Sequence, residues 1–286
     1  MEKTAMILEG GAMRGIYTAG VLDYLMEREY YPDHVIGVSI GSNNAVDYIS
    51  RQIGRTRDCM ALTDASLRYL NKNPLKLLKK KEMFDIDMIF NQFPNDRIPF
   101  DYETYFASEI TCELVVSNCL TGQAEYLDER EDRERLMAVL AASCSMPYVS
   151  HTIDVDGQPY LDGGCTDSVP LIHAMKSGYR KNIVILTRHK GYRKSSSRLS
   201  AFLTKRMYGK KYPEFAKTLL NRAHVYNRTM ELLEKWEAEG RIFVIRPEGE
   251  LVSRTEEDYE KLMALYQQGH DQMERLYPDL MAYLQA

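Results

Sequence analysis

Short runs of apolar residues alternate with stretches of helical periodicity along most of the chain. The apolar runs have the length and composition of buried parallel strands, and they occupy residues 5–8, 34–38, 113–118, 182–187 and 241–245. Helical patterns lie between them, at residues 15–28, 43–52, 130–142 and 170–177. Because alternating strands and helices are typical of α/β proteins, the pattern predicts a three-layer α/β/α fold with a mainly parallel central sheet flanked by helices.

Residues 58–106 depart from this alternation. They carry helical patterns and a cluster of lysines between residues 72 and 81. We expect them to form a helical cap or insertion near a functional site, set into a domain that spans residues 1–190.

The final third of the chain is mostly helical. Apolar residues recur at steps of three and four over residues 215–236 and again over 259–266, which is the spacing of a buried helix face. Ser253 or Thr255 has the position of an N-terminal cap for the last helix. We predict a helical C-terminal extension over residues 191–286 that packs on the same core.

Composition narrows the class of protein. A chain of 286 residues with 44% hydrophobic residues can bury a substantial core. The net charge of −4 gives no basic signature, so we expect no nucleic-acid partner. The five cysteines form no C-x-x-C pair, which argues for reduced thiols. The first residues contain no long apolar segment of a signal peptide and no run approaches a membrane span, so we expect a cytoplasmic protein.

The segment VIGVSIGSNN sets Ser39 in a G-x-S-x-G pattern between Gly37 and Gly41. A serine at the turn from a strand into a helix is typical of a nucleophile elbow, which exposes the hydroxyl at the carboxyl end of the sheet. Side chains at the two flanking positions would crowd each other, which explains both glycines. A plain glycine-rich turn with a capping serine gives the same pentapeptide, so this segment alone leaves both interpretations open.

A second glycine-rich loop follows the first predicted strand, in the segment LEGGAMRG. Its spacing matches neither a P-loop nor G-x-G-x-x-G. A strand–helix–strand crossover makes the two strands parallel, so both loops lie at the same edge of the sheet. The amides of Gly10, Gly11 and Ala12 are therefore candidates for an oxyanion hole facing Ser39. Arg14 is a candidate to hold this loop or attract an anionic head group; an exposed cation at the helix start is the alternative.

No histidine has the setting of a triad base. His34 lies at the far end of the strand that carries Ser39, and the other histidines lie within predicted helices or lack a recognisable catalytic turn. Asp162, followed by Gly163 in the segment YLDGG, is set to project from a turn, and a carboxylate accepts a serine proton when its surroundings raise its proton affinity. An Asp-Gly hairpin turn gives the same sequence. Asp167 is the second candidate carboxylate, to which we assign the capping of the next helix.

The segments EGGAMRG, GVSIG and DGG resemble, in order and spacing, the three motifs of the patatin-like phospholipases, which are acyl hydrolases with a Ser–Asp dyad. The resemblance covers roughly residues 5–186, and the C-terminal region resembles the extension of a bacterial branch of that family. It implies that no metal or organic cofactor is needed. The site residues that it implies are Ser39 as nucleophile, Asp162 as base, backbone amides near Gly10, Gly11 and Ala12 as oxyanion hole, and Arg14, Gly37, Gly41 and Gly163 in support. The sequence departs from the family at Glu9 and at Ala12, where a third glycine is usual.

The resemblance also implies lipid acyl esters as substrates, with phospholipase A or lysophospholipase activity. Residues 188–211 hold nine lysines and arginines and no acidic residue. With the cluster at 72–81, they are candidates for peripheral contact with an anionic surface such as the inner membrane surface, and a solvated basic segment is the alternative. Two other functions remain open: a soluble carboxylesterase or thioesterase for small acyl substrates, and a catalytically weak lipid-binding or regulatory protein.

Overall fold

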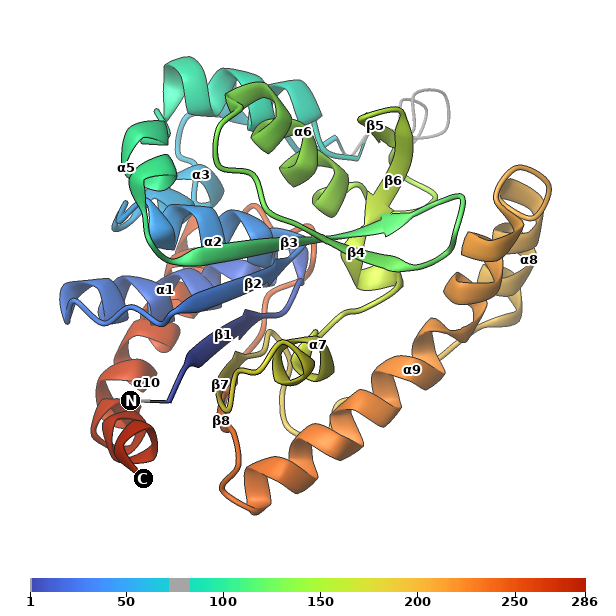
Figure 1. Ribbon diagram of the computed structural model, residues 1–286. Coiled ribbons are helices and arrows are strands. Elements are labelled where there is room, and N and C mark those ends of the chain that lie inside the picture. Colours follow the sequence, from blue (N-terminus) through green and yellow to red (C-terminus); the bar gives the residue numbers. More distant parts are fainter. Residues whose placement is uncertain (1, 72–82) are drawn as a thin grey trace.

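The computed structural model describes residues 2–71 and 83–286, which contain one sheet of eight strands (Figure 1). The strand order is β5-β6-β3-β2-β1-β7-β8, and β4 also pairs with β3. The strands are β1 (Thr4–Leu8), β2 (His34–Val38), β3 (Thr111–Asn118), β4 (Ala124–Leu127), β5 (Ile153–Val155), β6 (Gln158–Asp162), β7 (Lys181–Ile185) and β8 (Phe243–Ile245).

The centre of the sheet is parallel. Strands β3, β2, β1, β7 and β8 pair in parallel, whereas β4 and β6 are antiparallel to β3, and β5 is antiparallel to β6. The predicted fold class, α/β with a mainly parallel sheet, is therefore confirmed. All five predicted strands are present, and their ends lie within two residues of the predicted ones. No apolar run marks β4 and β5, because these short strands are partly exposed.

Helices cover both faces of this sheet. They are α1 (Gly15–Glu27), α2 (Ile40–Ile49), α3 (Arg55–Met60), the π-helix η3 (Met88–Arg97), α5 (Tyr102–Ala107), α6 (Arg133–Cys144), α7 (Leu171–Lys176), α8 (Arg198–Met207), α9 (Pro213–Ala238) and α10 (Tyr259–Gln285), with the short turns η1 (Ala12–Arg14), η2 (Ala65–Leu67) and η4 (Gly163–Cys165). The predicted cap of the last helix was wrong. The side chain of Asp258, not Ser253 or Thr255, caps α10 by accepting a hydrogen bond from the amide of Lys261.

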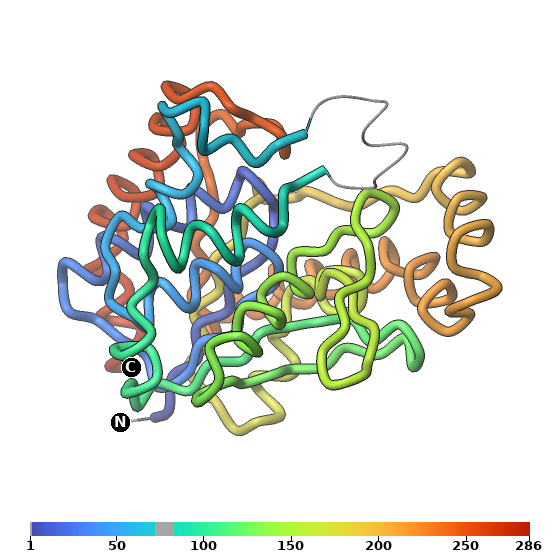
Figure 2. Tube along the Cα trace, turned by 90° about the horizontal axis from the view of Figure 1, so that it is seen from above, coloured from blue at the N-terminus to red at the C-terminus, as the bar shows by residue number. Residues whose placement is uncertain are grey.

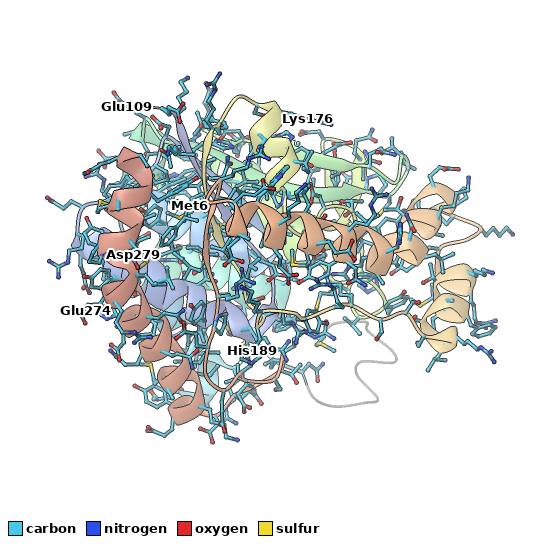
Figure 3. The ribbon with its side chains drawn as sticks, turned by 90° about the horizontal axis from the view of Figure 1, so that it is seen from below. Met6, Glu109, Lys176, His189, Glu274 and Asp279 are labelled. Atoms are coloured by element: carbon cyan, nitrogen blue, oxygen red, sulfur yellow. The ribbon has the colours of Figure 1, made fainter. Side chains whose placement is uncertain are left out.

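Side chains alternate along the strands and divide the core into two layers. In β1, Met6 and Leu8 belong to the cluster formed with α1, α2, α6 and α10, whereas Ala5 and Ile7 belong to the cluster formed with α7 and α9. Figure 3 shows α9 crossing the face of the sheet seen from below, with α10 to one side. The sheet is thus the middle of three layers.

The C-terminal helices contribute to both outer layers. Tyr226, Met230 and Leu233 of α9 are buried against one face of the sheet, α10 packs along α1 on the other, and β8 extends the sheet beside β7. The two chain ends lie on the same side of the molecule, and α8 projects at the opposite end (Figures 1 and 2). Residues from α9 to α10 therefore share one core with the preceding region.

Residues 58–106 hold the end of α3, η2, η3 and most of α5. Their apolar side chains, among them Phe84, Phe90 and Phe93, pack against the larger core cluster. The lysine cluster at 72–81 lies outside the described residues.

The cysteines and the possible membrane spans were also considered in the sequence analysis. All five cysteines are free thiols, as predicted. Over residues 2–71 and 83–286, no helix combines the length and the apolar character needed to cross a bilayer.

Candidate active site

Ser39 stands at the turn from β2 into α2 with backbone angles φ 57° and ψ −126°. This conformation is strained for a residue with a side chain, as it is in a nucleophile elbow. A Cβ atom on Gly37 would lie 2.5 Å from the carbonyl oxygen of Gly41, so the expected crowding between the flanking positions holds there. A Cβ atom on Gly41 would instead lie 2.3 Å from the carbonyl oxygen of Leu8, because β1 passes close to this turn.

A buried serine that the sequence analysis missed supports the strained turn. The hydroxyl of Ser143, near the end of α6, accepts a hydrogen bond from the amide of Ser39 at 2.9 Å and donates to the carbonyl of Val115 in β3 at 2.7 Å. The hydroxyl of Ser42 lies 2.8 Å from the hydroxyl oxygen of Ser143. Ser143 therefore ties the turn to the centre of the sheet. Its only sequence signal is a small polar residue in an otherwise apolar helix end.

Strand β3 aligns the two segments that carry Ser39 and Asp162. Val38, the last residue of β2, pairs with Val115, and Asp162, the last residue of β6, pairs with the next residue, Val116. Because β4 occupies the other edge of β3 over both registers, β2 and β6 lie end to end along the same edge. The sheet therefore brings Asp162 beside Ser39 across 123 residues of sequence.

Asp162 is held through both carboxylate oxygens. The hydroxyl of Ser39 donates to Oδ2 at 2.7 Å, and the amide of Gly164 donates to Oδ1 at 2.8 Å. Burial raises the pKa of Asp162, and the Arg222 guanidinium, these two hydrogen bonds and the Lys194 ammonium partly oppose that rise. The carboxylate thus binds a proton more readily than an exposed aspartate, while its orientation is fixed.

Gly163, next to this aspartate, has no room for a side chain. A Cβ atom on Gly163 would lie 2.1 Å from the carbonyl oxygen of Val115. The chain therefore turns from β6 into η4 directly against β3, which keeps Asp162 at the end of β2.

The loop of Gly10, Gly11 and Ala12 lies against Ser39, as expected for neighbouring parallel strands. A Cβ atom on Gly10 would lie 2.8 Å from Cβ of Ser39. Ala12 has a positive φ of 50°. Among the described residues, no protein acceptor receives a hydrogen bond from the amides of Gly10, Gly11 or Ala12. These amides stay candidates for the oxyanion hole.

Glu9, the residue before this loop, is bonded to the segment after β7 and to α9. The sequence analysis did not predict this role. The side chain is 3% exposed. Its Oε2 accepts the amide of Thr187 at 2.9 Å, and its Oε1 accepts the hydroxyl of Tyr226, in α9, at 2.8 Å. The hydroxyl of Thr187 also donates to the carbonyl of Gly10 at 2.8 Å. The departure from the family motif at Glu9 thus supplies a buried anchor.

Arg14 contacts the C-terminal region, and the expectation that it holds the loop stays a prediction. Its Nε donates to the carbonyl of Val252 at 2.9 Å, which links η1 to the C-terminal region. Burial first, and then the charges of Arg188 and Arg254, lower the pKa of Arg14. The side chain is half-buried, so it is not an exposed cation at the helix start.

The second candidate carboxylate serves another purpose. Oδ2 of Asp167 accepts a hydrogen bond from the hydroxyl of Tyr126 at 2.8 Å, and none of the described side chains caps α7. The prediction that Asp167 caps this helix was wrong, because the loop turns its carboxylate towards β4.

Three of the histidines make contacts outside the Ser39–Asp162 pair. Nδ1 of His34 lies 2.7 Å from the hydroxyl of Thr111, and Nε2 of His173 lies 2.7 Å from the carboxylate of Glu113. Nδ1 of His189, labelled in Figure 3, lies 3.0 Å from the carbonyl of Pro247. His34 and His173 thus contact the start of β3, and His189 contacts the loop after β8.

A largely apolar cavity opens beside Ser39. Its empty volume is about 760 Å³, a figure that includes open solvent at its mouth. Ser39 and Ala12 lie in its wall. Its apolar lining comes mainly from α3 and the 58–106 region and includes Met13, Met60, Tyr69, Phe84, Phe90 and Phe93.

The cavity wall also contains a compensated ion pair. Nη1 of Arg55 lies 2.7 Å from Oδ1 of Asp47, and the hydroxyl of Thr56 donates to Oδ2 at 2.6 Å. The other nitrogens of Arg55 donate to backbone carbonyls. This part of the wall therefore presents no unpaired charge to an apolar group in the cavity.

Fold and site together define an α/β protein with a serine on a strained strand-to-helix turn, a buried aspartate bonded to it, and an apolar cavity beside both. The model of the family "Patatin-like phospholipase" matches residues 6–175, more than half of the chain, and the chain therefore belongs to that family. Residues 212–285 match a second model, a domain of unknown function named DUF6363.

Two similar proteins add context. The uncharacterized protein YjjU of Escherichia coli (strain K12) is 28% identical over 193 residues, which are 65% of this chain and 52% of YjjU, so the chain spans about half the length of this curated relative. The crystal structure of VipD from Legionella pneumophila aligns with a TM-score of 0.50 and 14% identity over 99% of this chain and 67% of VipD. At that identity the likeness concerns the fold alone.

Proposed function

We propose that the protein is a lipid acyl hydrolase in which Ser39 is the nucleophile and Asp162 the general base. The observation that carries the proposal is the 2.7 Å hydrogen bond from the Ser39 hydroxyl to Asp162, made beside an apolar cavity. Membership of the patatin-like phospholipase family gives the expected class of reaction.

The reaction begins when Oγ of Ser39 attacks the carbonyl carbon of an ester and its proton passes to Asp162. The carbonyl oxygen becomes an oxyanion, and the amides of Gly10, Gly11 and Ala12 stabilise it. The tetrahedral intermediate collapses, and the departing alcohol takes the proton from Asp162. Water then attacks the acyl-enzyme carbonyl while Asp162 takes a proton from it. As this second intermediate collapses, Asp162 returns the proton to Oγ of Ser39 and the fatty acid is released.

The raised pKa of Asp162 supports its role as the base. A general base works best when its proton affinity is not too low for the proton that it must accept. Burial raises the pKa of this carboxyl, and no arginine or lysine is bonded to it directly among the described residues. The carboxylate is thus free to take a proton.

The cavity supports a fatty acyl chain as the group that the enzyme binds. Its lining is rich in aromatic and methionine side chains, and its ion pair of Asp47 and Arg55 is compensated. Burial of each methylene of an acyl chain contributes about 0.8 kcal/mol. We expect a preference for long acyl chains over short ones, which separates this proposal from a carboxylesterase or thioesterase for small substrates.

The test is hydrolysis of a panel of phospholipids, lysophospholipids and nitrophenyl esters of increasing chain length. We expect wild type to hydrolyse the long-chain esters and to be labelled by a fluorophosphonate probe. Ser39→Ala should do neither while it keeps the wild-type melting temperature. Turnover by purified Ser39→Ala would reject the assignment, and a folded wild type that resists the probe would favour a lipid-binding or regulatory role.

We also propose that an anionic phospholipid surface is the partner that delivers the substrate. Part of the basic segment 188–211 makes internal contacts, since Arg193 pairs with Glu234 at 2.7 Å and Lys194 donates to Ser168 at 2.9 Å. Five of the other seven cations are exposed on and after α8: Arg198, Lys205, Arg206, Lys210 and Lys211.

Exposed apolar side chains accompany these cations. Leu199 is 67% exposed and Phe202 is 60% exposed, one turn apart on α8, and α8 projects from the body of the molecule (Figure 1). A hydrogen bond connects the end of α8 to the cavity wall. The hydroxyl of Tyr208, directly after α8, accepts it from the amide of Tyr148 at 2.9 Å. Tyr148 lies two residues after Met146, which lines the cavity. The charge of α8 complements an anionic surface, and each cation near such a surface contributes about 1 kcal/mol.

Vesicle sedimentation of the Ser39→Ala protein tests this surface without hydrolysis. We expect binding to phosphatidylglycerol vesicles, weak binding to phosphatidylcholine vesicles, and loss of binding in Leu199→Ser/Phe202→Ser and in Lys205→Gln/Arg206→Gln. Ile53→Ser removes an apolar side chain that is 52% exposed elsewhere and should leave binding unchanged. Equal sedimentation with both kinds of vesicle would dismiss the anionic surface.

A further inference from the structure

One turn of α9 contacts both halves of the candidate site. Nε of Arg222 donates to the carbonyl of Gly164 at 2.5 Å. Four residues further along, the hydroxyl of Tyr226 donates to Oε1 of Glu9 at 2.8 Å. Both residues of α9 lie in the region that matches the domain of unknown function, outside the patatin-like match.

The contact with Gly164 fixes the turn that holds Asp162. The carbonyl of Gly164 also accepts the hydroxyl of Ser168 at 2.8 Å, and Nζ of Lys194 donates to that hydroxyl at 2.9 Å. The amide of Gly164 donates to Oδ1 of Asp162. Arg222 therefore acts on the carboxylate through one glycine residue.

The contact with Glu9 fixes the loop of the candidate oxyanion hole. The carboxylate of Glu9 joins the hydroxyl of Tyr226 to the amide of Thr187, and the glycine loop begins at the next residue, Gly10. Nζ of Lys194 lies 3.6 Å from the centre of the Tyr226 ring, so the two contacts share a neighbour.

We propose that Arg222 and Tyr226 are positioning residues that hold the base and the oxyanion loop in register with each other. The inference rests on the proposed function and gives the domain of unknown function a part in that reaction. A displacement of about 1 Å at a catalytic group costs about 10²-fold in rate, so rigid support of this kind has a measurable effect.

Arg222 also has an electrostatic signature that a packing role lacks. The charged and titratable groups around Asp162 are Arg222, Lys194, Cys144 and Cys165. The Arg222 cation lowers the pKa of Asp162 against the effect of burial. Its removal raises that pKa further, so the base becomes protonated at a higher pH.

The experiment compares Arg222→Met, Arg222→Lys and Tyr226→Phe with wild type in hydrolysis of a nitrophenyl ester and in labelling by a fluorophosphonate probe. We expect Arg222→Met to lower kcat and the labelling rate by about 10²-fold with little change in KM. The acid limb of its kcat/KM profile moves to higher pH. Arg222→Lys restores part of both effects, and Tyr226→Phe lowers kcat without moving the limb. Arg228→Met, an exposed position on the same helix, makes the same charge change and serves as the control.

The outcomes separate this inference from the proposed function. A wild type that neither hydrolyses esters nor reacts with the probe overturns both. A reactive wild type whose kcat, labelling rate and acid limb survive in Arg222→Met and Tyr226→Phe overturns the inference alone. If Arg222→Met does not fold, Tyr226→Phe, which removes one hydroxyl group, decides the question.

Discussion

Asp162 and Asp23 are two buried aspartates with the same kinds of hydrogen-bond donor. Asp162 accepts the hydroxyl of Ser39 and a backbone amide, and Asp23 accepts the hydroxyl of Tyr266 at 2.7 Å and the amide of Gly54 at 3.0 Å. They are 6% and 4% exposed. Burial raises the pKa of both, in Asp23 to about 6. Local carboxylate chemistry therefore does not distinguish them.

Their surroundings do distinguish them. Asp23 lies in the closed packing of α1 against α10, and its hydroxyl partner belongs to a tyrosine of the core. The hydroxyl partner of Asp162 belongs to a serine on a strained turn beside a cavity. The backbone amides next to it have no acceptor within residues 2–71 and 83–286. A raised pKa is thus a weak sign of catalysis alone, and the neighbouring nucleophile, cavity and amides give it meaning.

The sharpest test of this comparison is the matched pair Asp162→Asn and Asp23→Asn. An asparagine at 162 still fits the site but cannot take the proton of Ser39, so turnover should fall by about 10³-fold or more. Asparagine at 23 should leave turnover unchanged. The measurements are kcat for a long-chain nitrophenyl ester and the melting temperature of both variants. Equal losses of turnover, or none in Asp162→Asn, would sink the distinction.

Asp23→Asn should also differ from wild type in stability. The pKa of Asp23 is about 6 in the folded protein and 3.8 in a model aspartate. A folded pKa above the unfolded one means that the contribution of Asp23 to the free energy of unfolding is fully present below pH 3.8 and lost as pH rises through about 6. Asp23→Asn should therefore be more stable than wild type at pH 7.5, by up to about 3 kcal/mol. At pH 5 the gain in stability should be smaller.

Urea unfolding at the two pH values measures this gain. Both donors of Asp23 bond to the same oxygen, Oδ2, so the single carbonyl oxygen of asparagine accepts both. Tyr266→Phe is the companion variant, because it removes one donor and should destabilise the protein at both pH values. A less stable Asp23→Asn at pH 7.5 would contradict a buried carboxylate that is penalised for its charge.

The sequence predicted features that depend on neighbours along the chain. The apolar run at 34–38 matches β2 residue for residue, and the G-x-S-x-G spacing predicted the turn at Ser39. The pairing of Ser39 with the distant Asp162 was also predictable. The segment YLDGG carries its own turn signal, and the family resemblance places it in one site with the segment GVSIG.

Contacts between residues that belong to no motif were not predictable. Ser143 supports Ser39 from 104 residues away, and Tyr226 reaches Glu9 over 217 residues. Neither has a periodic or turn pattern that marks its partner. Asp167 shows the same limit, since its position before a helix suggested a cap and the fold of β4 supplied Tyr126 instead.

The smallest expected effect concerns the strained backbone at Ala12, in the loop beside Ser39. Ala12 has φ 50°, a conformation that costs a non-glycine residue about 1–2 kcal/mol, while glycine loses about 0.5–1 kcal/mol through the freedom of its unfolded chain. Ala12→Gly should thus be more stable by up to about 1 kcal/mol. Turnover should fall because the loop becomes less rigid. The loss should be smaller than that caused by removal of an oxyanion donor, which is about 10²-fold or more. Glu29→Gly, at φ 53° after α1, should gain similar stability with unchanged turnover. A faster Ala12→Gly enzyme would show instead that the third glycine of the family motif is what this loop lacks, and that the strain at Ala12 serves no purpose in the site.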